Sequence, residues 1–198
     1  MTRRHAPATV RNRDPILAVL RRVLPRTGIV LEIGSGSGEH AAYFAAALAP
    51  LRWQPSDASV ADFASITGWA REQGAATVDA PLLLDAASDI WPLTHADAVF
   101  SANVAHITPW AVAQGMVRGA GRVLPTGAPF VLYGPFKRGG SHTAPSNAAF
   151  DAELRRHDPS WGIRDIADVA AEAARHGLEL EEIVDMPANN FILVLRRR

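Results

Sequence analysis

The chain alternates between short runs of apolar residues and longer segments in which apolar residues recur every three or four positions. The runs are rich in β-branched and aromatic residues, which is typical of strands, and the segments between them have the spacing of one-sided helices. Strands are expected at 29–33, 51–57, 81–85, 97–103 and 129–136. The run at 81–85 is apolar until its last residue, as expected of a strand covered on both faces. Because strands that alternate with helices form parallel sheets, the pattern predicts an α/β fold with helices on both faces.

The first helix is expected to begin at Asp14, with its carboxylate as the N-cap and Pro15 in the first turn. Apolar residues then recur at helical spacing until Leu24. Residues 1–13 would form a polar arm in front of one domain that spans 14–198. Further helices are expected at 41–48, 59–70, 109–121 and 165–176.

Residues 137–165 form an unusually long connection after the fifth strand. A loop is expected at 137–142, where two glycines follow two basic residues, and a short helix at 147–157. Connections of this length are usually functional or disordered, so we interpret this segment as a lid or a substrate-binding insertion.

The chain ends in two expected strands, 178–186 and 191–197, joined by a turn that contains Asn189 and Asn190. Asparagine tolerates the left-handed conformations of tight turns, so the two strands are expected to form a hairpin with an antiparallel last strand. If the first of them runs parallel to the other five, the turn lies at their carboxyl ends. Asn189 and Asn190 would then reach the rim of a ligand crevice.

The composition excludes several classes of protein. The 198 residues suffice for one domain with a full core, and the net charge of zero gives no indication of nucleic acid or a membrane as partner. Without cysteine, disulfides, thiolate metal sites and cysteine nucleophiles are excluded, and no other metal site is expected. The arginine-rich N-terminus lacks the apolar segment of a signal peptide, and no run reaches membrane-spanning length. A cytoplasmic monomer or homodimer is expected.

Candidate chemistry is concentrated where the first strand ends. Gly34, Gly36 and Gly38 stand at alternate positions and precede a run of good helix formers. Glycine permits positive φ and close approach of backbone N–H groups, so this strand, turn and helix are typical of sites for nucleotide-like ligands. A dinucleotide fingerprint has its third glycine where this chain has Glu39, and the Gly-Lys-Ser/Thr of a P-loop is absent. A glycine turn without a ligand is the alternative.

Glu32, two positions before the first glycine, completes the pattern E-x-G-x-G-x-G. This pattern resembles motif I of the class I S-adenosylmethionine (SAM) methyltransferases, and a carboxylate near the loop suits the cationic SAM. More narrowly, the chain resembles domain-of-unknown-function family 938, whose eukaryotic members are called methyltransferase-like 26. The stretches that carry this likeness are 11–16, 31–40, 53–57, 103–107, 133–136, 161–165 and 187–190. The resemblance implies a single Rossmann-like class I methyltransferase fold with a seven-stranded, mostly parallel sheet.

Carboxylates at the ends of two further strands extend the expected cofactor site. Asp57 lies 19 residues after Gly38, where doubly wound folds place the carboxylate that accepts from ribose hydroxyls. The alternative is that Asp57 only starts the next helix. Asp85 ends the third strand and is placed to accept from the adenine amino group.

The resemblance implies roles for further residues. The glycine loop with Glu32 would hold the methionine part of SAM, Asn103 would line the pocket near the sulfonium, and residues 11–13 would fold over the SAM carboxylate. The expected cofactor-binding residues are Glu32, Gly34, Ser35, Gly36, Gly38, Asp57, Asp85, Asn103 and Arg13.

His106, just after the fourth strand, is the first candidate for a catalytic base because an imidazole titrates near neutral pH. Tyr133 is the second catalytic candidate, and a merely packed His106 is the alternative. The expected substrate-binding residues are His142, Trp161, Asn189 and Asn190. A small-molecule acceptor is expected, since the sheet edge carries no aromatic and basic platform for nucleic acid.

Two other functions stay open on the sequence alone. The protein could bind SAM without chemistry, as a partner or sensor. A nicotinamide-dependent oxidoreductase is disfavoured by Glu39 and by the absence of a recognisable Tyr-x-x-x-Lys pair.

Overall fold

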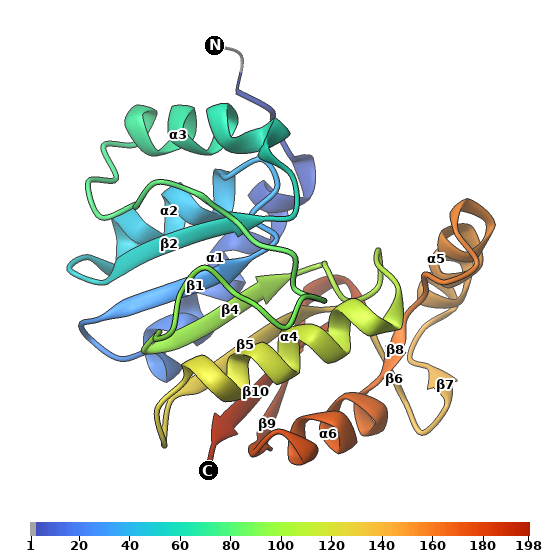
Figure 1. Cartoon of the computed structure of the whole chain (residues 1–198). Coiled ribbons are helices and arrows are strands. Elements are labelled where there is room, and N and C mark those ends of the chain that lie inside the picture. The colour runs from blue at the N-terminus through green and yellow to red at the C-terminus, as the bar shows by residue number, and fades with distance from the viewer. Residues whose placement is uncertain (1–2) are drawn as a thin grey trace.

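The computed structural model describes residues 3–198 and is built on one twisted seven-stranded sheet (Figure 1). The strand order is β3-β2-β1-β4-β5-β10-β9. The strands are β1 (Ile29–Ile33), β2 (Arg52–Asp57), β3 (Leu82–Leu83), β4 (Ala98–Ala102), β5 (Pro129–Gly134), β9 (Leu178–Met186) and β10 (Asn190–Arg197). Only β10 runs antiparallel to its neighbours, so β9 is parallel to the first five strands. The expected fold class and its antiparallel last strand are confirmed.

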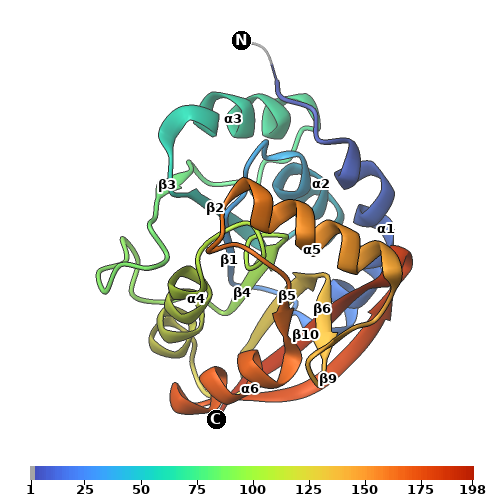
Figure 2. The ribbon, with the colours of Figure 1, turned by 90° about the vertical axis from the view of Figure 1, so that its right-hand side faces the viewer.

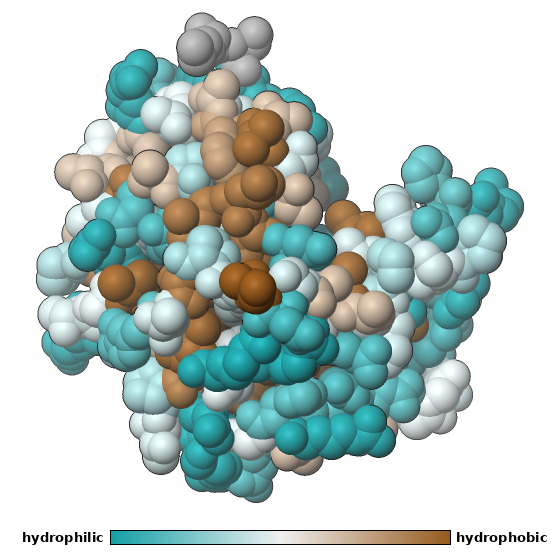
Figure 3. Space-filling model, viewed as in Figure 1, coloured by the Kyte–Doolittle hydropathy of each residue, from teal (hydrophilic) through white to brown (hydrophobic). Residues whose placement is uncertain are grey.

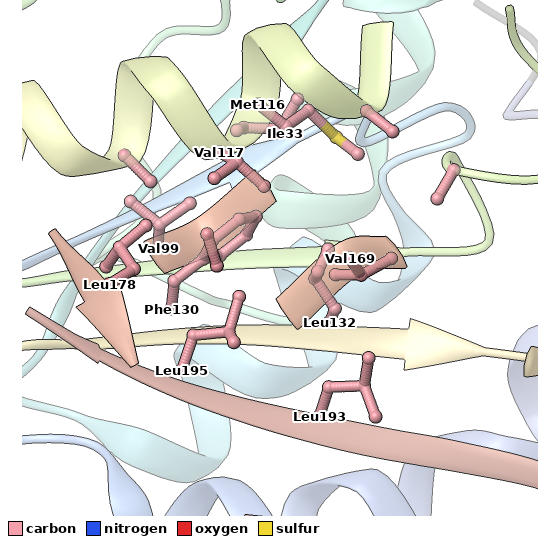
Figure 4. Packing of buried hydrophobic residues seen from close by; sticks show 14 of the residues in the cluster. Ile33, Val99, Met116, Val117, Phe130, Leu132, Val169, Leu178, Leu193 and Leu195 are labelled. Carbon is pink, nitrogen blue, oxygen red and sulfur yellow. The ribbon is translucent and has the colours of Figure 1, made fainter. Parts of the chain in front are cut away.

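Helices cover both faces of the sheet because successive strand residues point to opposite sides. In β1, Val30 packs toward α1 (Pro7–Val23) and α2 (Glu39–Leu48). Its neighbours Leu31 and Ile33 pack toward α4 (Trp110–Val123) and α6 (Ile166–Arg175). Figure 4 shows this second layer, where Met116 and Val117 of α4 lie over Val99 and Phe130. The third helix, α3 (Phe63–Glu72), follows the short turn η1 (Val60–Asp62) and packs against α2.

The first helix differs from its expected start. It begins at Pro7 rather than Asp14, and Pro15 lies inside it. Pro7 fits the first turn because the N–H that a proline lacks would have no partner there. The apolar pattern does not predict the turns before Asp14, because the buried residues Thr9 and Asn12 at their inward positions are polar. The expected arm at 1–13 is therefore largely helical, and its first two residues lie outside the described residues.

The third strand is shorter and less covered than expected. It keeps only Leu82 and Leu83, and the Leu83 side chain is 57% exposed. The physical reason is its place at the edge of the sheet, where it pairs with β2 alone. The expectation that a continuous apolar run is covered on both faces is wrong here.

Residues 137–165 are ordered into secondary structure rather than starting with a loop. β6 (Phe136–Arg138) and β7 (Ser141–His142) form a hairpin, and β8 (Arg164–Asp165) pairs with β6. Between them lies α5 (Pro145–His157), which crosses in front of the sheet when the carboxyl ends face the viewer (Figure 2). Asp151 of α5 ties the insertion together by contacting Lys137 and His142, at 3.2 and 3.3 Å.

Candidate functional site

Two adjoining cavities lie at the carboxyl ends of the strands. The first, of about 550 Å³, spans the ends of β1, β2 and β4. The second, of about 750 Å³, lies beside it under α5, and Figure 3 shows the hollow between the body of the molecule and the α5 lobe. Ala8, Asn103 and Ile107 belong to both walls. Both volumes are in the range of small-molecule sites.

The glycine loop forms the floor of the first cavity. Gly34, Gly36 and Gly38 all have positive φ, at 73°, 51° and 83°. A Cβ on Gly34 would lie 2.4 Å from a methyl of Val104, and one on Gly38 would lie 2.4 Å from Cα of Ile66 in α3. Gly38 does not reach the cavity wall, but its missing side chain lets α2 and α3 pack closely. At positions 34 and 38, only glycine fits both the backbone conformation and the surrounding atoms.

Glu32 lies behind the loop and outside the cavity wall, with only 2% of its surface exposed. Its Oε2 accepts hydrogen bonds from the Trp53 indole N–H at 3.0 Å and the Ser35 hydroxyl at 2.8 Å. Burial raises the pKa of Glu32 to about 7, against these two hydrogen bonds, which favour the ionised form. The structure therefore places Glu32 as a support of the loop, while Ser35 lines the cavity.

The two expected strand-end carboxylates both line the first cavity. Asp57 Oδ2 accepts from the Gly36 backbone N–H at 3.0 Å, and Oδ1 accepts from Ser59 N at 3.2 Å. Asp85 Oδ1 accepts from the Ala87 backbone N–H at 2.9 Å. Each carboxylate is thus fixed by backbone donors and retains lone pairs for a ligand.

Three titratable residues that line the first cavity were not expected from the sequence: Arg4, His5 and His40. Residues 4–6 are held over the cavity by α2 and α3, since Arg4 N donates to Ser65 Oγ at 2.9 Å and Ala6 N donates to Glu39 Oε2 at 3.1 Å. Nothing in the local sequence indicates this docking. His40 stands in the first turn after the glycine loop, a position that could have identified it.

His40 connects the walls of the two cavities. Its Nε2 lies 2.8 Å from Oδ1 of Asn12, which lines the second cavity. Burial and the nearby Arg13 charge lower the pKa of His40 to about 4, so the ring is neutral at pH 7. Because a carboxamide oxygen only accepts, Nε2 carries the ring proton and Nδ1 is left as an acceptor.

The second cavity collects residues that are distant in the sequence. Arg11 and Asn12 come from α1, Tyr133 from β5, and Asn147 and Phe150 from α5. His106 and the turn residues Asn189 and Asn190 complete this part of the wall. The expected position of the turn at the rim of the crevice is therefore observed. Asn103, with φ of 62°, donates its N–H to the Tyr133 carbonyl at 2.9 Å and stands between the two cavities.

His106 is 4% exposed and packs edge-to-face on Phe150, with ring centroids 5.6 Å apart. Burial, and to a smaller extent the Arg164 charge, lower the pKa of His106 to about 4. Burial raises the pKa of Tyr133, against opposing contributions from Asn12 and Arg11. At neutral pH the cavity therefore presents a neutral imidazole, which can accept a proton, and a protonated phenol. The expectation that His106 titrates near neutral pH is wrong, because burial disfavours its charged form.

Besides Glu32 and Gly38, three more expected site residues lie outside both cavities. The guanidinium carbon of Arg13 lies 4.5 Å from the centroid of the Tyr43 ring, over which it stacks. Successive helix residues point about 100° apart, so Arg13 points away from the side on which Arg11 lines the second cavity. His142 lies in β7 of the small sheet, and its Nε2 is 3.3 Å from the carboxylate of Asp151 in α5. Trp161 lies in a separate surface hollow with Leu154. Their expected cofactor and substrate contacts are not supported by these positions. Arg11 and Asn12 line the second cavity and not the first, so the expected closure of residues 11–13 over the SAM carboxylate is not supported either.

Two absences hold for the part of the chain that the structure describes. Within residues 3–198, no helix is both long and apolar enough to cross a membrane. The same residues contain no group of three or more histidine, cysteine, aspartate or glutamate side chains arranged to hold a metal ion.

Comparisons with known proteins agree with this architecture. A family model described as "Protein of unknown function (DUF938)" matches residues 3–197. The mitomycin 7-O-methyltransferase MmcR is 17% identical with a TM-score of 0.81, over 96% of this chain and 54% of that chain. The methyltransferase CalO1 of calicheamicin biosynthesis, solved with S-adenosylhomocysteine (SAH), is 18% identical with a TM-score of 0.73, over 96% and 55%.

An O-methyltransferase family 2 protein from Planctomyces limnophilus, solved with apigenin, is 15% identical with a TM-score of 0.76, over 94% of this chain and 62% of that chain. The chain thus spans little more than half the length of these proteins. At such identities the likeness shows the fold, which is that of SAM-dependent methyltransferases.

Proposed function

The chain belongs to the DUF938 family, and we propose that it transfers a methyl group from SAM to a small-molecule acceptor. The observation that carries this proposal is the contact between the two cavities at Asn103. One cavity has the carboxylates Asp57 and Asp85 in its wall, and the other has the neutral imidazole of His106. A methyl donor and an acceptor in these cavities would meet where the walls join.

The residues of the first cavity fit SAM chemically. Asp57 offers oxygens to two adjacent ribose hydroxyls, and Asp85 offers one to the adenine amino group. These carboxylates suit a cation and would repel a pyrophosphate, which favours SAM over a dinucleotide. When bound, SAM supplies a methyl group on a sulfonium, from which the thioether leaves readily.

The rest of the reaction depends on the chain's own residues. We assign His106 as the base that takes the proton of the acceptor atom while that atom bonds to the methyl carbon and the C–S electron pair passes to sulfur. The Phe150 ring packs on the His106 imidazole and shields it from water, since His106 is only 4% exposed. Alignment of two reactants in adjoining cavities can supply about 7–11 kcal/mol of the barrier reduction.

Asp57 tests the cofactor assignment. Asp57→Ala is expected to weaken SAM binding by about 1–3 kcal/mol, because it removes charge-assisted hydrogen bonds to hydroxyls. Asp57→Asn keeps an acceptor for the Gly36 N–H and separates the loss of charge from a movement of the loop. Affinity is measured by calorimetric titration, with thermal unfolding as the check on folding.

The matched control is Asp89→Ala, an exposed carboxylate paired with Arg118 outside both cavities, which should bind SAM like the wild type. Unchanged affinity in a folded Asp57→Ala protein would contradict the ribose assignment.

A further inference from the structure

The two adjoining cavities carry opposite charges. The first has the carboxylates Asp57 and Asp85 in its wall, and the guanidinium of Arg4, which also lines it, is paired with Asp62. In the second, Arg11 is the only side chain with a formal charge at neutral pH among the described residues of the wall. A cavity with one cation and no carboxylate favours an anionic ligand and disfavours a cationic one.

Arg11 is free to bind such a ligand. It is exposed on the first helix, and within residues 3–198 its guanidinium makes no ion pair or side-chain hydrogen bond. The nearby arginine Arg13 is engaged with Tyr43, and Arg4 pairs with Asp62 at 2.9 Å. A guanidinium presents parallel N–H donors that match the two oxygens of a carboxylate.

The neutral amides of the second cavity are already used to hold its wall together. Asn147 Nδ2 donates to the Asn189 carbonyl at 2.9 Å, and Asn189 Nδ2 donates to Ser146 Oγ at 3.3 Å. Asn190 Nδ2 donates to the Pro187 carbonyl at 3.1 Å. The first two bonds join α5 to the hairpin turn and the third lies within the turn, so these three amides contribute less to ligand recognition than their number suggests.

The groups left for a ligand are arranged from the rim to the interior. Arg11 is exposed at the rim, whereas His106 and Tyr133 are buried. The same wall has the apolar side chains of Phe150, Pro135 and Ile107. A molecule that satisfies all of these groups has a charged end, an apolar body and a polar end that faces the imidazole.

We propose that the methyl acceptor is a small organic acid whose carboxylate pairs with Arg11 and whose hydroxyl faces His106. This inference rests on the proposed function, because it identifies the second cavity as the acceptor site. The hydroxyl oxygen bonds to the methyl carbon, its proton passes to His106, and the product is the methyl ether of the acid with its carboxylate intact. The carboxylate is held at the rim and is not the atom that reacts.

Calorimetric titrations of the full chain saturated with SAH test the proposal. The probes are para-hydroxybenzoate, para-hydroxyphenylacetate and para-coumarate, each compared with its neutral methyl ester. We expect the acids to bind and their esters to bind at least about tenfold more weakly, the effect of losing a charged hydrogen-bonded pair. Arg11→Gln should reduce acid binding by a similar factor and leave SAH binding unchanged, since Arg11 does not line the first cavity.

Arg21→Gln is the matched control, because Arg21 is exposed on the same helix outside both cavities. It should bind the acids like the wild type. Equal binding of acids and esters, acid binding unaffected by Arg11→Gln, or no binding of any acid to the SAH-loaded protein would each overturn the proposal. Failure of SAH itself to bind would contradict the proposed function instead, and the same titrations without SAH would still decide whether Arg11 marks an anion site.

Discussion

Replacing His106 by glutamine is expected to lower the rate of methyl transfer by about a hundredfold to ten-thousandfold, the usual contribution of a positioned base. SAM affinity should not change, because His106 does not line the first cavity. The measurement is a single-turnover assay with radiolabelled SAM and an acceptor that binds the second cavity. His157→Gln is the control, since His157 is a histidine at the end of α5 that lies outside both cavities.

The pH dependence gives a second readout of the same substitution. A base acts in its unprotonated form, and the pKa of His106 is lowered to about 4 by burial. The wild-type rate is therefore expected to be flat above about pH 5 and to fall as the pH decreases through 4. This low-pH limb should disappear in His106→Gln. Unchanged turnover in His106→Gln would show that His106 is only packed against Phe150. If the wild-type protein binds SAM but transfers no methyl group to any acceptor, the result would favour the sensor alternative.

Gly38→Ala is expected to destabilise the folded protein by about 2–5 kcal/mol. The backbone at Gly38 is left-handed, which alone costs an alanine about 1–2 kcal/mol. The added Cβ would also lie 2.4 Å from the Cα of Ile66, so α3 must move away from α2. The loss is measured as the free energy of unfolding in urea, followed by circular dichroism.

Gly74→Ala separates these two contributions. Gly74 has a similar φ of 60°, but a Cβ there meets no atom within 4 Å. Gly74→Ala should therefore lower the free energy of unfolding only by the cost of the left-handed backbone, and clearly less than Gly38→Ala does. Equal losses in the two variants would mean that the contact between α2 and α3 does not depend on the missing side chain of Gly38.

Most of the fold follows from the apolar pattern because the strands β1, β4, β5 and β10 are buried and form nearly continuous apolar runs. The apolar pattern does not predict a helix whose buried side chains are polar, and it overstates the coverage of a strand that is only partly buried. The first two turns of α1 present Thr9 and Asn12 inward, which gives no apolar signal. The edge strand β3 is an apolar run that its neighbours do not cover.

The candidate site was predictable where the topology determines it. Asp57, Asp85 and the turn at Asn189 follow the carboxyl ends of strands, so their place in the crevice follows from strand direction alone. Arg13 was misplaced because one residue of helix phase separates it from the cavity side. His142 and Trp161 were misplaced because the small sheet of two- and three-residue strands has no detectable periodicity.

The most direct test of the account is a calorimetric titration of the purified full chain with SAM, SAH and NAD. Micromolar dissociation constants are expected for SAM and SAH, because Asp57 and Asp85 can accept from the ribose hydroxyls and the adenine amino group that both carry. No binding of NAD is expected, because the same carboxylates would repel its pyrophosphate. Tight binding of NAD without binding of either sulfur ligand would contradict the account.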